Sequence, residues 1–239
     1  MTIPAPSQQQ QHQDNRSNDF QTARLSFKPS SVSDAPALHE LRTEGEVMKW
    51  SRQKRPDNDI AETEAWIRKV RSGFTSPETE TTTTTEPGLE SDKTPSPLTG
   101  CSFSVRNLNT HTNGEDASID KIIGTIGISA HKSEITGKNR CEIGYMFVPR
   151  VWGQGYASEA VKGLVGWWFD ALKESKIQGQ GQKEVALDGC EEGVYAVVAK
   201  SNLGSLRVME KCGFSVVGEG VDDEGDGILE FCILNSGKL

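Results

Sequence analysis

The chain has 239 residues, 34% of them hydrophobic, which suffices for one domain core and leaves too little apolar sequence for a second. Its net charge of -8 argues against nucleic acid as the main partner, and it has no apolar run long enough to cross a membrane. The glutamine-rich N-terminus has no apolar signal segment and the 5 cysteines form no C-x-x-C pair, so we expect a cytoplasmic (intracellular) protein with reduced thiols and no membrane partner.

The N-terminal part of the chain combines a polar tail with the first elements of the fold. Residues 1–20 hold too few apolar side chains to offset the entropy of ordering, so we predict a disordered tail followed by a single domain over residues 21–235. Alternating apolar residues predict a short strand over residues 25–29. Two helices follow, and a capping box formed by Asp59 and Glu62 begins the second.

Two low-complexity stretches interrupt the pattern. Residues 75–98 contain a run of threonines and several Ser-Pro and Thr-Pro pairs, and residues 173–193 contain Gly-Gln-Gly-Gln. Neither has the apolar residues that would anchor it to a core, so both are predicted to be insertion loops. Between them, residues 103–106 and 121–129 have the alternating pattern of strands.

The next strand leads into the most informative segment of the chain. Residues 141–148 alternate, with Glu142 on one face and Tyr145 on the other. A turn with Gly153 and Gly155 then joins this strand to an amphipathic helix over residues 157–171. Glycines let the main chain turn tightly and point several N–H groups outward, at the positive end of the following helix. This combination predicts a binding site for phosphate groups.

Two familiar phosphate-binding loops do not fit the turn. A P-loop requires Gly-Lys-Ser/Thr, whereas Gly155 is followed by Tyr156 and Ala157. A dinucleotide fingerprint requires a glycine or alanine at the position of Ser158 and parallel strands around it, which the upstream pattern does not indicate.

The C-terminal part is predicted to complete the sheet. A strand over residues 194–199 precedes a short helix over residues 203–212, which stops at Gly213. A hairpin around the acidic loop 221–227 follows. The last three residues, Gly-Lys-Leu, differ from the peroxisomal address Ser-Lys-Leu at the first position, so a peroxisomal location is kept only as an alternative.

No metal site is predicted. Asp222, Glu224 and Asp226 alternate as in a calcium loop, but Ile233 stands where the loop needs a bidentate glutamate. The four histidines are scattered along the chain without the spacing of zinc ligands.

Three motifs, taken in order, resemble the GNAT superfamily of acyl-CoA-dependent N-acyltransferases. They are Glu142-Ile143-Gly144-Tyr145, the turn from Trp152 to Ala160, and Asn202 to Ser205 continued by Glu210 to Phe214. The likeness is nearest to the branch that contains the ribosomal-protein N-terminal acetyltransferases RimJ and RimL. The resemblance implies an α+β fold with α/β/α layers: a mixed, mostly antiparallel sheet of about seven strands, splayed at its middle and flanked by about four helices.

The resemblance also implies a binding site for acetyl-CoA as cosubstrate. Main-chain amides of the turn would hold the pyrophosphate, main chain at the end of the preceding strand would pair with the pantetheine arm, and the start of the last helix would contact that arm. The residues so implied are Met146, Phe147, Val148, Arg150, Val151, Trp152, Gly153, Gln154, Gly155, Tyr156, Ala157, Asn202 and Ser205.

The implied reaction is acetyl transfer to a primary amine, either a protein N-terminus or a small-molecule amine, by direct attack in a ternary complex. Glu142 is the candidate base, and its alternative role is that of an ordinary ion-paired carboxylate. Many family members protonate the leaving thiolate with a tyrosine where this chain has Met209, so the general acid is unassigned. The alternative function is therefore a catalytically inactive acyl-CoA sensor or interaction module. Trp50, Trp66 and Tyr145 are candidates either for the acceptor cleft or for the core. The oligomeric state is left open.

Overall fold

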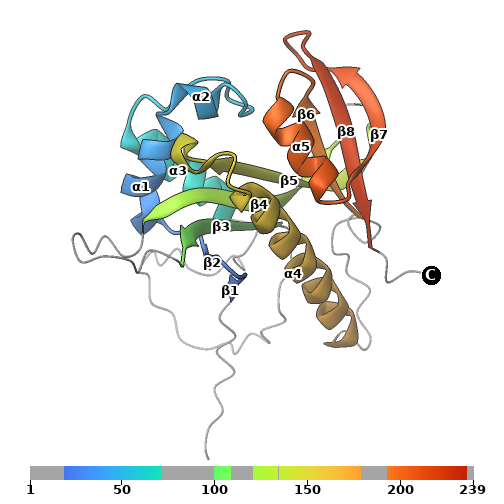
Figure 1. Ribbon diagram of the computed structural model, residues 1–239, viewed down its shortest axis with the longest axis horizontal. Helices are drawn as coiled ribbons and strands as arrows, with labels where there is room; N and C mark the ends of the chain where they lie inside the picture. The colour runs from blue at the N-terminus through green and yellow to red at the C-terminus, as the bar shows by residue number, and fades with distance from the viewer. Residues whose placement is uncertain (1–18, 72–99, 109–120, 134, 179–192, 236–239) are drawn as a thin grey trace, which may run out of the picture.

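The computed structural model describes residues 19–71, 100–108, 121–133, 135–178 and 193–235. Within them the chain forms one eight-stranded sheet in the order β1-β2-β3-β4-β5-β6-β8-β7, and every neighbouring pair is antiparallel except β5 and β6 (Figure 1). The strands are β1 Phe20–Gln21, β2 Leu25–Pro29, β3 Gly100–Asn107, β4 Ile122–Lys132, β5 Asn139–Phe147, β6 Gly193–Ala199, β7 Ser215–Val221 and β8 Gly227–Leu234. The predicted mixed, mostly antiparallel sheet is confirmed, with the two-residue β1 added at its edge.

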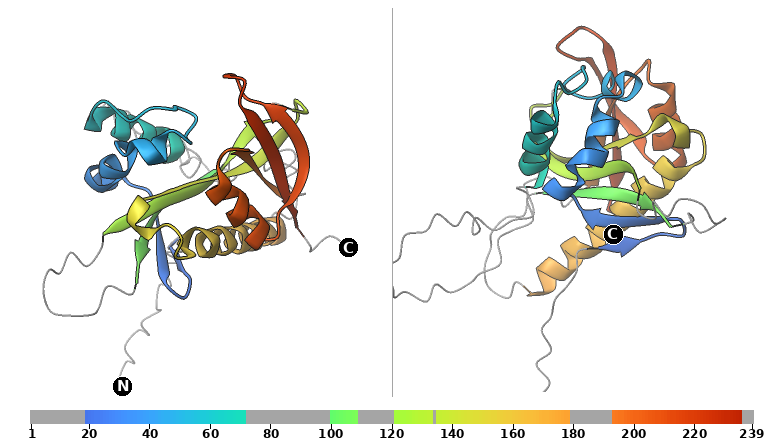
Figure 2. Two further views of the ribbon diagram at one scale, coloured as in Figure 1. Left: turned by 45° about the horizontal axis from the view of Figure 1, so that its top comes forward. Right: turned by 90° about the vertical axis from the view of Figure 1, so that its left-hand side faces the viewer.

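Helices cover both faces of the sheet. The two layers lie on opposite sides of β4 and β5 (Figure 2). One contains α1 Ala35–Arg42, α2 Gly45–Met48 and α3 Ile60–Arg71, and the other contains α4 Tyr156–Gln178 and α5 Leu203–Lys211. The predicted α+β architecture with α/β/α layers is therefore confirmed, with the single turn α2 as an additional helix.

The predicted tail and insertions fall largely outside the described residues. All of 75–98 does so, as does most of 1–20 and of 173–193. The first part of the last segment, residues 173–178, is helical and continues α4.

The core extends on both faces of the sheet, with Leu38 and Ile67 on the side of α1 and α3 and the tryptophans of α4 on the other. Trp168 is fully buried, and its neighbour Trp167 stacks on Phe20 and meets Phe103 edge to face. These ring contacts supply large apolar burial with favourable geometry. Both tryptophans therefore belong to the core.

A buried ion pair holds the segment between α2 and α3 against the core. Arg42 donates to both carboxylate oxygens of Asp57, at 2.6 and 2.8 Å, and Thr63 donates to the same carboxylate at 2.7 Å. Burial would raise the pKa of Asp57, but the hydrogen bonds from Arg42, Thr63 and Gln53 outweigh it and hold that pKa below its ordinary value. This anchored segment carries Arg52 and Lys54, which reach the functional site.

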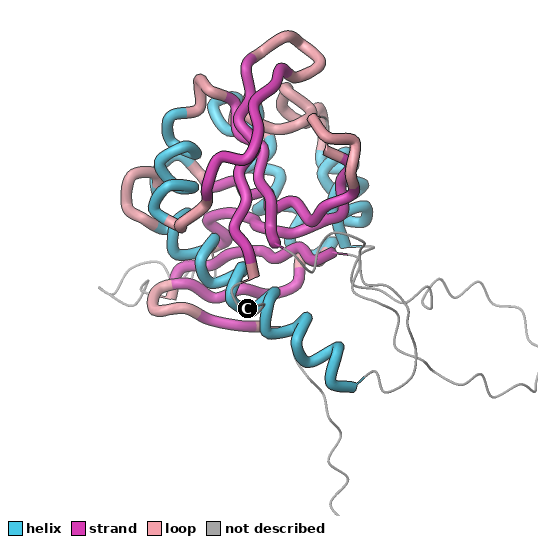
Figure 3. Tube along the Cα trace, turned by 90° about the vertical axis from the view of Figure 1, so that its right-hand side faces the viewer, coloured by secondary structure: helices cyan, strands magenta, loops and turns pink. Residues whose placement is uncertain are grey.

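The sheet opens between β5 and β6. The two strands pair only at Cys141↔Val194 and Glu142↔Tyr195, although β5 continues to Phe147. In Figure 3 the strands β6 to β8 run in a clearly different direction from the strands of the first part of the sheet. The predicted splay at the middle of the sheet is thus present, with Glu142 at its closed end.

The expectation of reduced cysteines is correct for Cys101, Cys212 and Cys232, which are buried thiols, and wrong for Cys141, which is disulfide-bonded. No helix in the described part of the chain is both long and apolar enough to cross a bilayer.

Candidate functional site

The glycine turn lies at the open end of the splay. After β5 the chain makes a short 3-10 turn, Pro149–Val151, and enters α4 through Gly153 and Gly155. Their φ angles are +74° and +82°, a left-handed conformation that favours glycine. A Cβ atom on Gly153 would meet no atom within 4 Å, so the space beside the turn is open. Residues 152–155 are exposed. The N–H groups of Val151 and Trp152 already bond to the carbonyls of Val148 and Pro149, so the amides that the turn offers to an anion begin at Gly153.

An ion pair fixes the turn to the N-terminal strands. Glu159, in the first turn of α4, accepts hydrogen bonds from the Thr22 hydroxyl at 2.6 Å and from the main-chain N–H and Nε of Arg24 at 2.8 and 2.6 Å. Burial would raise the pKa of Glu159, but these hydrogen bonds outweigh it and lower that pKa. The Arg24 guanidinium also donates to the carbonyl of Gln154 at 3.1 Å. The charge of Glu159 is thus compensated, and it does not oppose an anion at the turn.

The main chain of β5 supplies one wall of the opening. Val148 donates its N–H to Ile123 of β4, and its carbonyl accepts the N–H of Val151. Met146 therefore directs its main-chain groups toward β4, as does the N–H of Val148, and the alternate residues direct theirs toward β6. The carbonyl of Phe147 already accepts a hydrogen bond from the Trp152 indole at 2.7 Å. Main-chain groups of Tyr145 and the N–H of Phe147 therefore face the opening. The prediction was that main chain of Met146 to Val148 would pair with pantetheine. The alternation of an antiparallel ladder instead turns Tyr145 and Phe147 toward the opening.

The start of α5 supplies the opposite wall. Asn202 is the N-cap of α5, and its side-chain oxygen accepts the N–H of Ser205 at 3.1 Å. Both residues follow directly from β6, so the predicted contacts on the last helix lie across the splay from β5. Met209 is fully buried in the core and carries no proton donor.

Glu142 is tied into an ion network at the closed end of the splay. Its carboxylate accepts hydrogen bonds from Arg52 at 2.8 Å and from Arg140 at 3.2 Å, and its side chain is 11% exposed. Arg140 also forms an ion pair with the buried Glu230 of β8. Glu142 is therefore an anion held between two guanidinium groups on the sheet face opposite Tyr145 and α4.

His131 is a neighbour of Glu142 that the sequence analysis missed. It lies on β4 opposite Arg140, and its Nε2 is 3.0 Å from the Ser129 hydroxyl. Burial lowers the pKa of His131, against the raising effect of the Glu142 charge, so the imidazole is neutral at neutral pH. The two residues could have been linked from the sequence only by predicting the register of the β4–β5 hairpin, which sets His131 opposite Arg140 and Ser129 opposite Glu142.

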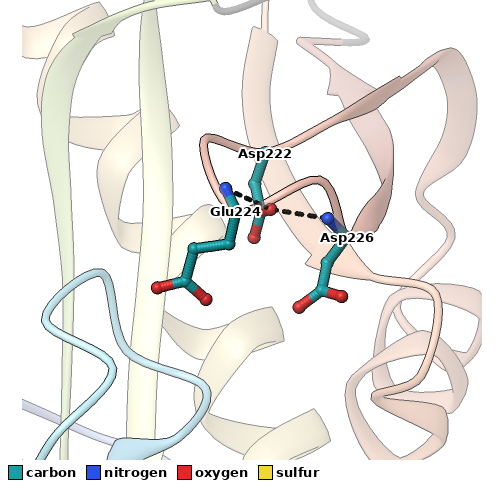
Figure 4. A group of neighbouring side chains, drawn as sticks. All are labelled: Asp222, Glu224 and Asp226. Atoms are coloured by element: carbon teal, nitrogen blue, oxygen red, sulfur yellow. Dashed lines mark hydrogen bonds between the residues drawn. The ribbon is translucent and has the colours of Figure 1, made fainter.

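The acidic loop between β7 and β8 binds a lysine of the same chain. The Lys54 ammonium lies 3.0, 3.7 and 4.0 Å from carboxylate oxygens of Asp222, Glu224 and Asp226. Asp222 also accepts the main-chain N–H groups of Glu224 and Asp226 (Figure 4). The hydrogen bond with Asp222 is the main cause that raises the pKa of Lys54. The loop thus joins the segment between α2 and α3 to the last hairpin.

Comparisons with known protein families and solved structures agree with the fold described above. Residues 24–215 match the family model described as the acetyltransferase (GNAT) domain. An uncharacterized N-acetyltransferase of Bacillus subtilis, YoaA, is 34% identical over 98 residues, which are 41% of this chain and 44% of that protein. The matched segment therefore spans less than half of the length of this curated relative.

Two solved structures share the fold over nearly the whole chain. A spermidine N-acetyltransferase of Vibrio cholerae in complex with CoA and spermine is similar with a TM-score of 0.58 at 15% identity, covering 90% of this chain and 98% of that one. A ribosomal-protein-S5-alanine acetyltransferase of Vibrio fischeri is similar with a TM-score of 0.57 at 16% identity, covering 91% of this chain and 96% of that one. At these identities the likeness concerns the fold.

Proposed function

The chain belongs to the GNAT acetyltransferase family, and from that premise we propose that it transfers an acetyl group from acetyl-CoA to a primary amine by direct attack in a ternary complex. The acceptor is a protein N-terminus or a small-molecule amine. The observation that carries the proposal is the splay between β5 and β6, which opens toward a glycine turn at the N-terminus of α4.

The proposed orientation of acetyl-CoA places its pyrophosphate at the glycine turn and its thioester at the middle of the splay. The pyrophosphate binds the accessible amides of the turn, where the backbone conformation and the helix dipole favour negative charge. The pantetheine arm runs along β5 past Phe147, with Asn202 and Ser205 on the opposite wall. The thioester then reaches the middle of the splay, and the amine approaches from the sheet face that bears Glu142.

The amine must lose its proton before it attacks. A lysine-type amine with a pKa near 10.4 costs about 4 to 5 kcal/mol to deprotonate at pH 7, whereas an α-amino group near 7.8 costs about 1 kcal/mol. Glu142 is the proposed base, directly or through water, once the exposed Arg52 moves aside. Placing amine and thioester together supplies much of the remaining acceleration.

A direct test is calorimetric titration of the purified protein with acetyl-CoA, followed by a screen of amines for acetylated product. Micromolar binding with product formation supports the transferase. Binding without turnover of α-amines, polyamines or lysine-type amines supports the alternative of an acyl-CoA sensor, which is suggested by the methionine at position 209 in place of the tyrosine of many family members. Absence of binding by a folded protein contradicts both.

Glu142→Gln is expected to lower kcat on the order of 100-fold for a lysine-type amine and less for an α-amine, because removal of a general base costs most where the proton is held most tightly. The affinity for acetyl-CoA should be unchanged. Steady-state kinetics with both acceptor classes measure the ratio of the two effects.

The matched control is Glu230→Gln, which also removes a carboxylate partner of Arg140 but lies on β8. In Glu230→Gln, the ratio of kcat for a lysine-type amine to kcat for an α-amine should equal the ratio in the parent protein. An unchanged kcat for both classes in Glu142→Gln would show that Glu142 is only an ion-pair partner.

A further inference from the structure

The sheet face that bears Glu142 has an open patch directly beyond that residue on β5. Gly144 follows two residues later, so it lies on the same face, and it is exposed although β5 is an interior strand of the sheet. A Cβ atom on Gly144 would meet no atom within 4 Å, and the residue opposite it on β4 is another glycine, Gly127. The two glycines leave room for a small molecule beside the Glu142 carboxylate.

An exposed arginine covers the carboxylate of Glu142. Arg52 donates to Oε1 at 2.8 Å and Arg140 donates to Oε2 at 3.2 Å. The Arg140 side chain is 5% exposed and also pairs with Glu230, whereas the Arg52 side chain is 57% exposed. Arg140 is therefore a fixed partner of Glu142. Arg52 can exchange Glu142 for another carboxylate with little loss of stability, because an exposed ion pair contributes little.

The surroundings of Glu142 carry more positive than negative charge, unlike the chain as a whole. The charged groups that act on the neighbouring His131 are three cations, Arg52, Arg140 and Lys69, and one anion, Glu142, in a chain with a net charge of -8. A guanidinium presents a flat fork of N–H donors, which matches the two oxygens of a carboxylate. The acceptor side of the site therefore combines a candidate base with a group that binds an anion.

We propose that the acceptor is a free α-amino acid, whose own carboxylate takes the place of Glu142 on Arg52. This rests on the proposed transferase function. The amine then lies over Gly144, beside the Glu142 oxygen that Arg52 has left, while Arg140 holds the other oxygen. The ammonium gives one proton to the released oxygen, and the neutral amine attacks the thioester. Arg52, which covers the base in the unliganded protein, thus selects the acceptor.

The first test measures recognition of the carboxylate without requiring turnover. N-acetylalanine and N-acetylalaninamide, the products expected from alanine and its amide, are titrated by calorimetry into the parent protein and into Arg52→Gln, each saturated with CoA. The two probes differ only at the carboxylate, and neither has an amine that titrates. The parent should bind N-acetylalanine about 10-fold more tightly, the strength of one hydrogen bond to a charged group, and Arg52→Gln should bind both probes equally.

The matched control is Arg68→Gln. Arg68 is also an exposed arginine paired with a glutamate, Glu64, but both of these residues lie on α3. The variant removes the same charge from the surface. It should leave the preference for N-acetylalanine at the value of the parent protein.

Gly144→Val tests where the acceptor binds. The side chain enters open space and valine is favoured in strands, so the variant should fold. Its affinity for CoA should be that of the parent, because Gly144 lies on the sheet face opposite α4. Its affinity for N-acetylalanine should fall on the order of 10-fold, because the valine occupies the place of the acceptor.

The second readout for Arg52 is kinetic. The ratio of kcat/KM for alanine to kcat/KM for alaninamide should fall about 10-fold in Arg52→Gln. Comparison of the ratio between parent and variant cancels the difference in amine pKa between the two acceptors.

The outcomes separate the two proposals. If the parent protein does not bind CoA, the transferase function itself is wrong. If CoA binds while the parent binds neither probe, binds both equally, or keeps its preference in Arg52→Gln, the amino-acid acceptor is overturned while the transferase function stands. Faster acetylation of a diamine than of alanine would also overturn it, because a second ammonium would favour the acidic loop 221–227 over Arg52.

Discussion

Gly155→Trp should weaken acetyl-CoA binding on the order of 1,000-fold. The indole would cover the exposed amides at the start of α4, and loss of two hydrogen bonds to a charged phosphate group, at about 1.5 to 3 kcal/mol each, corresponds to such a change in Kd. The Cβ atom itself fits, because its nearest neighbour is Nη2 of Arg24 at 3.5 Å. Isothermal titration calorimetry of parent and variant measures the change directly.

The control for this variant must carry the same backbone strain. Gly137→Trp serves, because Gly137 has φ +68° in the β4–β5 turn and a Cβ there would meet only Lys132, at 4.0 Å. Both variants should lose a similar amount of stability, about 1 to 2 kcal/mol for the left-handed conformation. Only Gly155→Trp should lose acetyl-CoA. Retained affinity in a folded Gly155→Trp protein would place the phosphate site elsewhere.

Asp57→Ala should lower the free energy of unfolding by about 3 to 5 kcal/mol, because it leaves the guanidinium of Arg42 buried without its partner. The Arg42 and Asp57 side chains are 3% and 0% exposed, so solvent does not screen this pair. Urea denaturation measures the loss. Glu64→Ala breaks the exposed pair with Arg68 on α3 and should change stability by less than about 0.5 kcal/mol.

The contribution of Asp57 should depend on pH in a defined direction. Its pKa in the folded protein is below the ordinary value of 3.8, so the folded state favours the charged form. The stabilisation is complete above the ordinary pKa and is lost as the pH falls through the lowered value. The stability difference between parent and Asp57→Ala should therefore be constant near neutrality and shrink in acid. A difference that grows in acid would contradict this assignment.

Local sequence patterns predicted much of the fold. The alternation of residues 141–148 predicted β5, and the apolar spacing of residues 157–171 predicted α4 apart from its extension to Gln178. Gly213, predicted to end the helix before it, has φ +82°. The capping box of α3 is present in part, since Asp59 accepts the N–H of Glu62 while Glu62 accepts that of Asn58. These features depend on residues a few positions apart, which is why a single sequence indicates them.

Contacts between distant segments were not predictable in the same way. Arg52 and Lys54 reach Glu142 and Asp222 across 90 and 168 positions of sequence. Their positions depend on the strand order and on the anchored segment between α2 and α3, neither of which leaves a periodic signal. The disulfide of Cys141 was missed for the same reason.

The sequence by itself determined the local pieces: the glycine turn, the helix that follows it and the alternating strands, because each arises from the conformational preferences and spacing of neighbouring residues. Only the tertiary structure decided which side chains share a site. The parallel pairing of β5 and β6 ends at Glu142, and this early end opens the splay. The fold also brings Arg52 and Arg140 to the two oxygens of the Glu142 carboxylate. This placement depends on the packing of the whole sheet, which no short stretch of the sequence determines by itself.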